Sequence, residues 1–281
     1  MSATNVPATA SGSRLRDAIS DWMVLTKRNL VTYIRKPDLL VFSTIQPVMF
    51  VVLFVYVFGG AIGEVLPSNV PYVDFLMPGI FVQTGIFAAM QTGVGLADDL
   101  QKGLIDRFRS LPMARSAVLA GRTAADTVSV VFQAVLMLIV AYAVGYRLHE
   151  GLLESLLAFL VLVGVGHSFT WVSAFAGLSL KTIEAVQAAT FTIVFPFVFV
   201  SSAFVPVETF PTWLQGFANA NPVTIWVDTV RVLTLGELYT DSSQFFSDVP
   251  ALGTLLWQSA AWVVGIMAVF ATLGVRVYRR T

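Results

Sequence analysis

Long apolar stretches separated by short polar segments dominate the pattern of this chain. Because about 20 apolar residues cross the hydrocarbon core of a bilayer, each long stretch predicts a membrane-spanning helix. Prolines and glycines inside these stretches are tolerated where neighbouring helices satisfy the backbone groups they free. The pattern predicts an all-α polytopic membrane protein with six transmembrane helices, at residues 39–60, 75–97, 124–146, 152–178, 185–205 and 254–275.

The N-terminal region differs from the spans. Residues 1–13 are rich in Ala, Ser, Thr and Gly, and we expect a disordered tail. No apolar signal-peptide core follows them. Residues 14–36 place their apolar side chains on one side of a helical wheel and carry several basic residues, which predicts an interfacial amphipathic helix ended by Pro37. Residues 14–281 are expected to form a single transmembrane domain.

The segment before the last span, residues 206–253, is too apolar in its first part for an ordinary solvated loop. Prolines and glycines interrupt it, so we predict a re-entrant helical hairpin, with an external loop packed on the bundle as the alternative. Asp228 and Arg231 are three residues apart and can pair on a helix. The residues singled out in this segment are Pro211, Trp213, Asn221, Pro222, Asp228 and Arg231.

Composition and charge agree with a membrane protein. The chain is 56% hydrophobic and 12% charged, about half the charged fraction of a soluble domain. Its 17 basic and 17 acidic residues cancel, so nothing suggests a nucleic-acid partner. All Lys and Arg except Arg147 and Arg231 lie on one side of the predicted topology. Positive residues stay inside, so both termini should be cytoplasmic.

The residues offer no catalytic constellation. The chain has no cysteine, and it contains neither a phosphate-binding P-loop nor the H-E-x-x-H and G-x-S-x-G motifs. Its two histidines, His149 and His167, form no metal-ligand cluster with carboxylates. We therefore expect no enzyme activity, no catalytic residue, no bound cofactor and no metal on this chain.

Polar side chains within spans are costly and often functional. Gln46, Gln83, Gln91 and His167 are candidates for a substrate path, and Gln133 and Gln187 share the pattern. Interhelical hydrogen bonding is the alternative role for each of them.

One strongly charged stretch, residues 99–116, interrupts the apolar pattern between spans two and three. Read as a helix over 99–111, it puts Leu104 and Phe108 on one face and Lys102 opposite, four residues before Asp106. Asp98 and Asp99 suit a helix N-terminus, and Pro112 ends the helix. A plain charged loop would not need an apolar face, so we predict a cytoplasmic helix that docks onto a partner.

Two segments resemble a known family. DLQKGLIDRFRSLPMARSAVLAGR, residues 99–122, resembles the signature region of ABC-2 type exporter permeases, closest to the daunorubicin-resistance (Drr-type) branch. NPVTIWVDTVRVLTLG, residues 221–236, is similar to that family's segment before the last span. Many family members have Glu where this chain has Asp99 or Gln101.

The resemblance implies a permease of the bacterial plasma membrane that moves a hydrophobic or amphipathic drug, lipid or glycolipid outward. Two permease subunits, identical or related, would associate with two separate ATPase subunits that bind ATP and magnesium, and with membrane lipids. The helix after span two would be the coupling helix, with Leu104 and Phe108 as apolar anchors. The coupling residues implied are Asp99, Lys102, Gly103, Leu104, Asp106, Arg107, Phe108, Arg109 and Pro112.

Two alternatives stay open from the sequence. A polysaccharide or teichoic-acid exporter of the same family would differ only in its cargo. A secondary transporter or channel would need no ATPase, but the chain shows no inverted repeat and no charge pairs within its spans, which such proteins often have.

Overall fold

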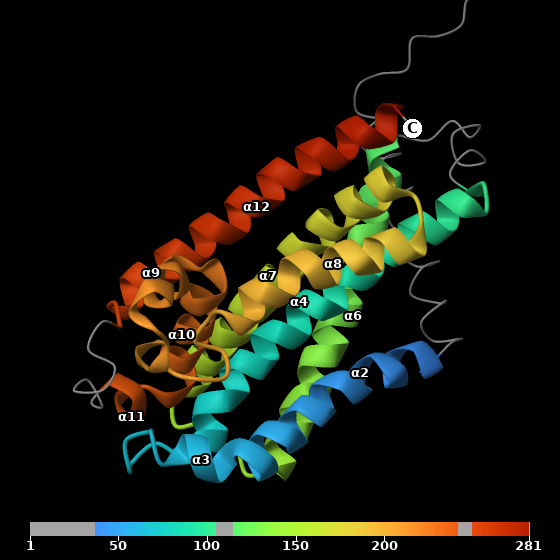
Figure 1. The fold of residues 1–281 in the computed structure, drawn as a ribbon. Helices are drawn as coiled ribbons and strands as arrows, with labels where there is room; N and C mark the ends of the chain where they lie inside the picture. Colours follow the sequence, from blue (N-terminus) through green and yellow to red (C-terminus); the bar gives the residue numbers. More distant parts are fainter. Residues whose placement is uncertain (1–36, 105–114, 241–248, 281) are drawn as a thin grey trace, which may run out of the picture.

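The computed structural model describes residues 37–104, 115–240 and 249–280, which form a bundle of helices joined by short connections (Figure 1). Within these ranges there is no strand, so the predicted all-α class is confirmed. The expected N-terminal tail, the interfacial helix and the middle of the charged segment, residues 105–114, lie outside the described residues and stay predictions.

The helices follow one another in a simple order. The first are α2 (Pro37–Val52), the π-helix η1 (Leu53–Phe58), α3 (Gly59–Gly63), α4 (Tyr72–Gln101) and α6 (Arg115–Ala143). Then come α7 (Leu152–Leu180), α8 (Ile183–Phe199), the 3-10 turn η2 (Val207–Thr209), α9 (Thr212–Ala220), α10 (Pro222–Leu235), α11 (Glu237–Thr240) and α12 (Leu252–Arg280).

Five helical segments of the described chain are long and apolar enough to cross a membrane: Thr44–Gly63, Tyr72–Gln101, Leu119–Ala143, Leu152–Leu180 and Leu252–Tyr278. The remaining predicted span corresponds to α8, an apolar helix of 17 residues, which at 1.5 Å per residue is about 25 Å long. It ends at Phe199, before the predicted 205, because the backbone turns out of the helix at Val200. Helices α4, α7 and α12 extend past the predicted spans because their polar ends are still helical, whereas α6 begins before its predicted span and ends at Ala143, short of the predicted 146.

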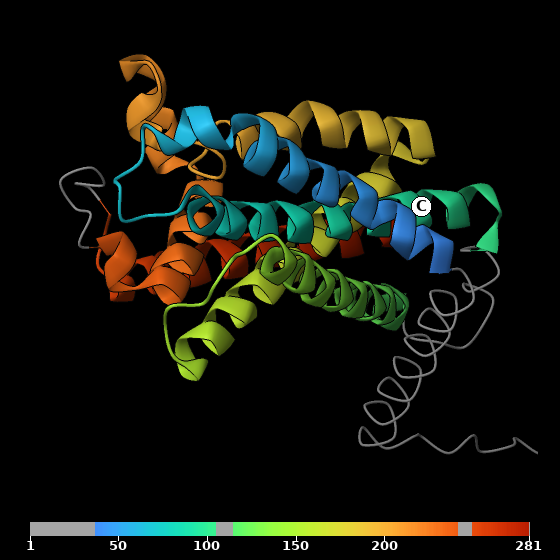
Figure 2. The ribbon, with the colours of Figure 1, turned by 90° about the horizontal axis from the view of Figure 1, so that it is seen from below.

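Helix α4 is the centre of the bundle. Phe75, Ile80 and Ile86 along it are completely buried. Figure 1 shows α8 and α2 on either side of α4, and Figure 2 shows both displaced to the same side of it. Side chains of α2, α4 and α8 line a groove along this side of α4.

Helices α4 and α7 approach each other at backbone distance. A Cβ on Gly93 would overlap the backbone of Ser173, and a Cβ on Gly177 would overlap the backbone of Gly93. Ser173 Oγ accepts a hydrogen bond from Gly93 N at 2.8 Å and donates one to Met90 O at 2.8 Å. Small residues and hydroxyls at such crossings let membrane helices pack and bond closely, so this crossing fixes α7 against α4.

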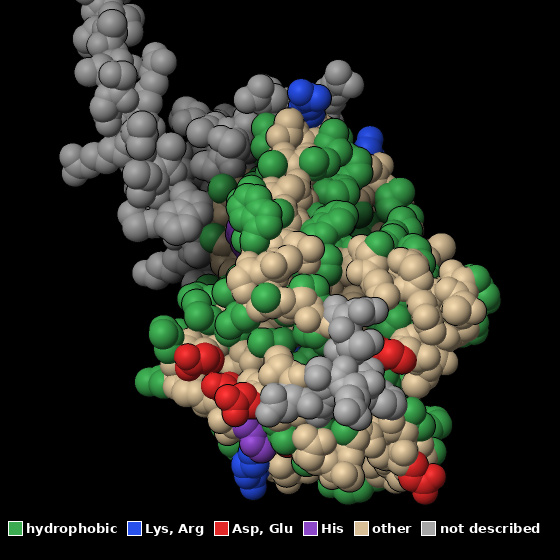
Figure 3. Space-filling model, turned by 90° about the vertical axis from the view of Figure 1, so that its left-hand side faces the viewer, with side chains coloured by type: hydrophobic (Ala, Val, Ile, Leu, Met, Phe, Trp, Pro, Cys, Tyr) green, Lys and Arg blue, Asp and Glu red, His purple; other side chains and the backbone are tan. Residues whose placement is uncertain are grey.

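The two ends of the bundle differ. One end carries α3, α9, α10 and α11, and the opposite end carries the start of α2, the last turn of α4 and the C-terminal end of α12 (Figure 1). Figure 3 looks onto the first end, where acidic side chains gather near a histidine and a basic side chain. Arg147 and Arg231, the two basic residues predicted to lie opposite all the others, belong to this end: Arg147 N donates to Asp74 Oδ1 near the start of α4.

The charged segment begins differently from the prediction. Asp98 and Asp99 belong to the last turn of α4, which ends at Gln101 with Lys102 as its C-cap. Gly103 follows with φ of 66°, the left-handed conformation that ends helices and favours glycine. A helix starting at Asp99 is therefore wrong, because the acidic pair completes the long helix before it.

Candidate functional site

A cavity of about 340 Å³ lies in the groove between α2, α4 and α8, with one side chain from α6. Three of the four predicted path residues, Gln46, Gln83 and Gln91, line it, together with Gln133 and Gln187. Sequence spacing could not show this, because the five amides come from four different helices. Their convergence makes the cavity the candidate binding site.

Two residues that line the cavity carry buried polar atoms without a partner among the described residues. Gln83 and Thr84 are 3% and 1% exposed. Neither Gln83 Oε1 nor Thr84 Oγ1 has a hydrogen-bond partner among the described residues. Since an unsatisfied buried polar group costs free energy, such atoms indicate that something else meets them. Thr84 was not singled out from sequence, because threonine is common in membrane helices.

His167 lies apart from this cavity. Its Nδ1 is 2.7 Å from Thr127 Oγ1 on α6, and Trp171 Nε1 donates to its Nε2 at 3.4 Å. The Thr127 hydroxyl already donates to Thr123 O at 2.7 Å, so His167 Nδ1 is the donor of the pair. With both ring nitrogens engaged, this histidine joins α6 to α7, the alternative role considered for it, and a place on the path stays a prediction.

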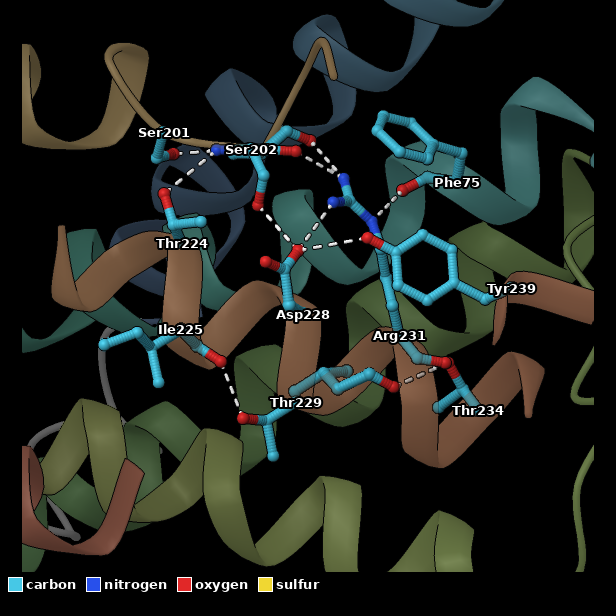
Figure 4. Close-up of polar contacts among 12 residues, drawn as sticks. Phe75, Ser201, Ser202, Thr224, Ile225, Asp228, Thr229, Arg231, Thr234 and Tyr239 are labelled. Atoms are coloured by element: carbon cyan, nitrogen blue, oxygen red, sulfur yellow. Dashed lines mark hydrogen bonds and ion pairs between the residues drawn. The ribbon is translucent and has the colours of Figure 1, made fainter. Parts of the chain in front are cut away.

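The segment before α12 is built around a buried arginine (Figure 4). Arg231 on α10 is completely buried. Its Nη1 donates to Asp228 Oδ1 at 3.1 Å, which confirms the predicted pair, and its Nε donates to Phe75 O at 2.9 Å. Its Nη2 donates to Ser202 O and Ala203 O, and its guanidinium carbon lies 3.6 Å from the Phe75 ring centroid.

Asp228 completes this network from the other side. Its Oδ1 accepts from Ser202 Oγ at 2.8 Å and from Tyr239 Oη at 3.4 Å. Burial raises the pKa of the Asp228 carboxyl, while the Arg231 guanidinium opposes the rise. Burial also raises the pKa of Tyr239 above its usual range, so its phenol stays protonated and donates. The network joins α10, α11, α4 and the 200–204 turn into one unit.

The junction between α9 and α10 is fixed by Asn221 and Pro222. Asn221 caps α10 by accepting from Val223 N at 3.0 Å, and Pro222 occupies the first helical turn, where its missing N–H costs nothing. Asn221 Nδ2 donates to Phe197 O and Val200 O, both at 2.7 Å, at the end of α8. Of the other predicted residues, Pro211 precedes α9 and Trp213 is 79% exposed on it.

An ion cluster joins the two helices that flank the charged segment. Arg122 on α6 pairs through Nη1 with Asp99 Oδ2 of α4 at 2.9 Å, and through Nε with Asp126 Oδ2 at 3.2 Å. The guanidinium lies against the α4 backbone at Gly95, where a Cβ would overlap Arg122 Nη2. We call Asp99, Arg122 and Asp126 the α4–α6 clamp. Sequence reasoning missed it, because 23 residues separate Asp99 from Arg122.

The clamp changes the role of one predicted coupling residue. Asp99 is engaged within the chain, whereas Lys102 is exposed and pairs with Asp98 at 2.6 Å. The predicted pairing of Lys102 with Asp106 stays a prediction, because Asp106 lies outside the described residues. Gly103 and Leu104 follow at the end of α4. The other predicted coupling residues, Asp106, Arg107, Phe108, Arg109 and Pro112, lie outside the described residues.

The chain is similar in sequence to a family of membrane transporters and to several of its members. Residues 20–235 match the family described as ABC-2 type transporter. The chain is 32% identical to the daunorubicin resistance ABC transporter permease protein of Streptomyces coeruleorubidus, covering 93% of this chain and 87% of that protein. It is 27% identical to a doxorubicin resistance ABC transporter permease protein of Mycobacterium tuberculosis, covering 71% and 68%. It is also 27% identical to a protein named as a transport permease in Cyanophora paradoxa, covering 82% and 77%.

Proposed function

This chain belongs to the ABC-2 type transporter family, and from that premise we propose that it is the permease subunit of an ATP-driven exporter in a bacterial plasma membrane. It is a multi-pass membrane protein with five candidate spans among its described residues. Relatives named as daunorubicin- and doxorubicin-resistance permeases support a drug as the cargo. The proposal extends this to hydrophobic or amphipathic compounds in general, lipids and glycolipids included.

In this proposal α8 is the fifth of six spans in chain order, and both termini are cytoplasmic. The distribution of basic residues supports that orientation. Helices α9 and α10 form the re-entrant segment at the outer end. Support comes from the Asn221–Pro222 break between them and from the burial of α10, whose Trp226 and Val227 are inaccessible.

The α4–α6 clamp is the observation that carries the coupling part of the proposal. The clamp ties together both ends of the segment that resembles the family's coupling region. A displacement of that segment by a partner would therefore move α4 and α6 together. Since α4 is also the floor of the cavity, the displacement would reach the binding site through one rigid helix.

The partners follow from this arrangement. Two cytoplasmic ATPase subunits would each engage one charged segment and hold ATP and magnesium. A second permease, either another copy or a related chain, would complete the membrane part. This chain would bind no nucleotide itself.

Purification in mild detergent with mass spectrometry of the associated proteins tests the proposal. We expect a stoichiometric ATPase that is lost when Leu104→Asp or Phe108→Asp removes an apolar anchor. Leu152→Asp is the matched control, because Leu152 is 88% exposed at the start of α7, where an acidic side chain suits the helix N-terminus. The control should retain the ATPase.

Two results would contradict the proposal. A permease that purifies without any nucleotide-binding subunit in several detergents would favour a secondary transporter or channel. An ATPase retained by both anchor variants would place the docking surface elsewhere on the chain. Export of polysaccharide instead of small apolar compounds by the assembled complex would change only the cargo.

A further inference from the structure

We propose that the cavity between α2, α4, α6 and α8 binds an uncharged amphipathic molecule, with hydroxyl or carbonyl groups on Gln83 and Thr84 and an apolar ring system on a row of phenylalanines. The direction of movement along that row rests on the proposed export function. Binding itself does not, and the two can be tested apart.

The lining of the cavity selects against charge. Its polar side chains are the five glutamines and two threonines, and none of the described residues lining it is acidic, basic or histidine. Transferring an ion into such a lining would strip its water without offering a counter-charge. A neutral molecule with hydrogen-bonding groups finds partners there at no such cost.

The two unpartnered atoms define the polar contact. Gln83 Oε1 can only accept, and Thr84 Oγ1 can donate or accept. Both residues line the cavity, so hydroxyl or carbonyl groups of a ligand there could donate to Gln83 and accept from Thr84. Thr92, eight residues after Thr84 on α4, also has a buried Oγ1 without a partner among the described residues, but it does not line the cavity. Thr92 therefore offers a matched control.

The apolar contact is a continuous series of aromatic rings, which we call the phenylalanine row. In order, the rings are Phe87, Phe191, Phe195, Phe199, Phe204, Phe54 and Phe58. The distances between successive ring centroids are 6.1, 6.4, 4.1, 4.9, 4.6 and 5.5 Å. These separations allow the stacked and tilted arrangements that aromatic rings favour. The first two rings line the cavity.

The row gives the cavity a direction. Gln46, Gln91 and Gln187 are exposed and lie toward the end that carries the start of α2 and the last turn of α4. The row leaves the cavity the opposite way and finishes at Phe58, the last residue of η1, next to α3 (Figure 1). π-Helical segments are rare and are often found at functional sites. The arrangement is thus a polar mouth, a polar floor and an aromatic track toward the outer end.

Photolabelling of the full chain in lipid nanodiscs tests the binding site. The probe is 4-(hydroxymethyl)benzophenone, which is neutral, aromatic and hydroxylated, and peptide mass spectrometry locates its insertion. We expect saturable labelling of α4 and α8 peptides. The half-saturating concentration should rise about tenfold in Gln83→Leu and in Thr84→Val, the size expected for one lost hydrogen bond. Thr92→Val should match the wild type.

Two related probes isolate the chemistry. Benzophenone lacks the hydroxyl, so it should bind wild type and Gln83→Leu equally. 4-(Aminomethyl)benzophenone is a cation and should label the cavity at least about tenfold more weakly. Equal labelling by the hydroxylated probe in wild type, Gln83→Leu and Thr84→Val would overturn the proposal, because the probe would then bind without the polar contact to these two residues. Absence of saturable labelling in the wild type would mean that the cavity holds water only. Both substitutions replace an unsatisfied buried group by an apolar one, so folding should survive, and a thermal unfolding scan verifies this.

The row is tested by export from vesicles containing the assembled complex. Phe199→Ala should slow probe export several-fold without changing the half-saturating concentration at the cavity. Phe175→Ala is the control, because Phe175 pairs with Phe270 at 5.7 Å outside the row. Equal export by Phe199→Ala and Phe175→Ala would overturn the row as a track. Cavity labelling without any ATP-driven export by the wild type would overturn the proposed function and leave the binding site standing.

Discussion

Replacing Arg122 with methionine should separate the two helices that flank the charged segment. The side chain of Arg122 is 18% exposed, as is that of Asp99, while that of Asp126 is 2% exposed. Methionine keeps much of the length and apolar stem of arginine but cannot bridge the two carboxylates. We expect both a loss of stability and a loss of coupling.

The size of the effect follows from burial. Breaking a fully buried ion pair costs about 3–5 kcal/mol, and an exposed pair contributes up to about 1 kcal/mol. Because two of the three clamp side chains keep some contact with solvent, we expect a value between these limits, about 2 kcal/mol. At about 2–4 °C per kcal/mol, the unfolding midpoint in detergent should fall by about 4–8 °C.

A double-mutant cycle measures the contact itself. Arg122→Met and Asp99→Asn should each lower the free energy of unfolding. The double variant should be destabilised by less than the sum of the two single effects, and the difference should exceed about 0.5 kcal/mol. Gly95→Ala disturbs the same contact without removing a charge, because the new Cβ displaces the Arg122 guanidinium. Gly265→Ala is its control, since a Cβ there meets nothing within 4 Å.

The functional measurement compares ATP hydrolysis with export in the assembled complex. Arg122→Met and Gly95→Ala should keep hydrolysis but export fewer molecules per ATP, whereas Gly265→Ala should behave as wild type. Additive destabilisation in the cycle, together with an unchanged export ratio, would refute the reasoning that the clamp links α4 to α6 during transport.

Two further substitutions test the packing. Gly177→Ala places a Cβ against the backbone of Gly93 and should destabilise the protein by about 1–3 kcal/mol. Gly164→Ala is the control, because its Cβ would meet Val263 at an ordinary 3.7 Å, and it should change stability little. Equal unfolding midpoints of the two variants would contradict the close crossing. Arg231→Lys keeps the charge but loses the fork of donors to Asp228 and the backbone, so we expect at least about 2 kcal/mol of destabilisation in thermal unfolding, and a midpoint within 1 °C of wild type would contradict the network.

The apolar pattern was enough to predict the class and the approximate positions of the helices, because each span must satisfy its own backbone in lipid. The apolar pattern predicted the ends of the helices less accurately. Hydropathy follows the hydrocarbon region, whereas α4 continues as a helix to Gln101 on hydrogen bonds that polar side chains do not interrupt. The acidic pair was therefore assigned to the wrong helix. The Asp228–Arg231 pair was predictable because both residues share one helix turn.

Contacts between helices could not be read in the same way. Periodicity shows which face of a helix is apolar but not which other helix it meets. The convergence of Gln46, Gln83 and Gln91 depends on how α2 and α4 cross, and the α4–α6 clamp depends on a return of the chain after the charged segment. The sequence shows where the glycines are but not which of them lie at close contacts. A Cβ at Gly93 would overlap Ser173, whereas a Cβ at Gly265 would enter open space.

The Gly93–Gly177 crossing divides α4 into a short segment and a long segment. Measured along the helix at 1.5 Å per residue, Gly93 lies about 12 Å from Gln101 and about 31 Å from Tyr72. If α4 pivots at this crossing, a displacement imposed at the Gln101 end reappears at the Tyr72 end in the opposite direction and about two and a half times larger. Spin-label distances from α7 to each end of α4 would reveal the pivot by opposite signs, and equal shifts at both ends would mean that the helix slides. With such a pivot, a small displacement at the Gln101 end of α4 would produce a larger displacement at the Tyr72 end.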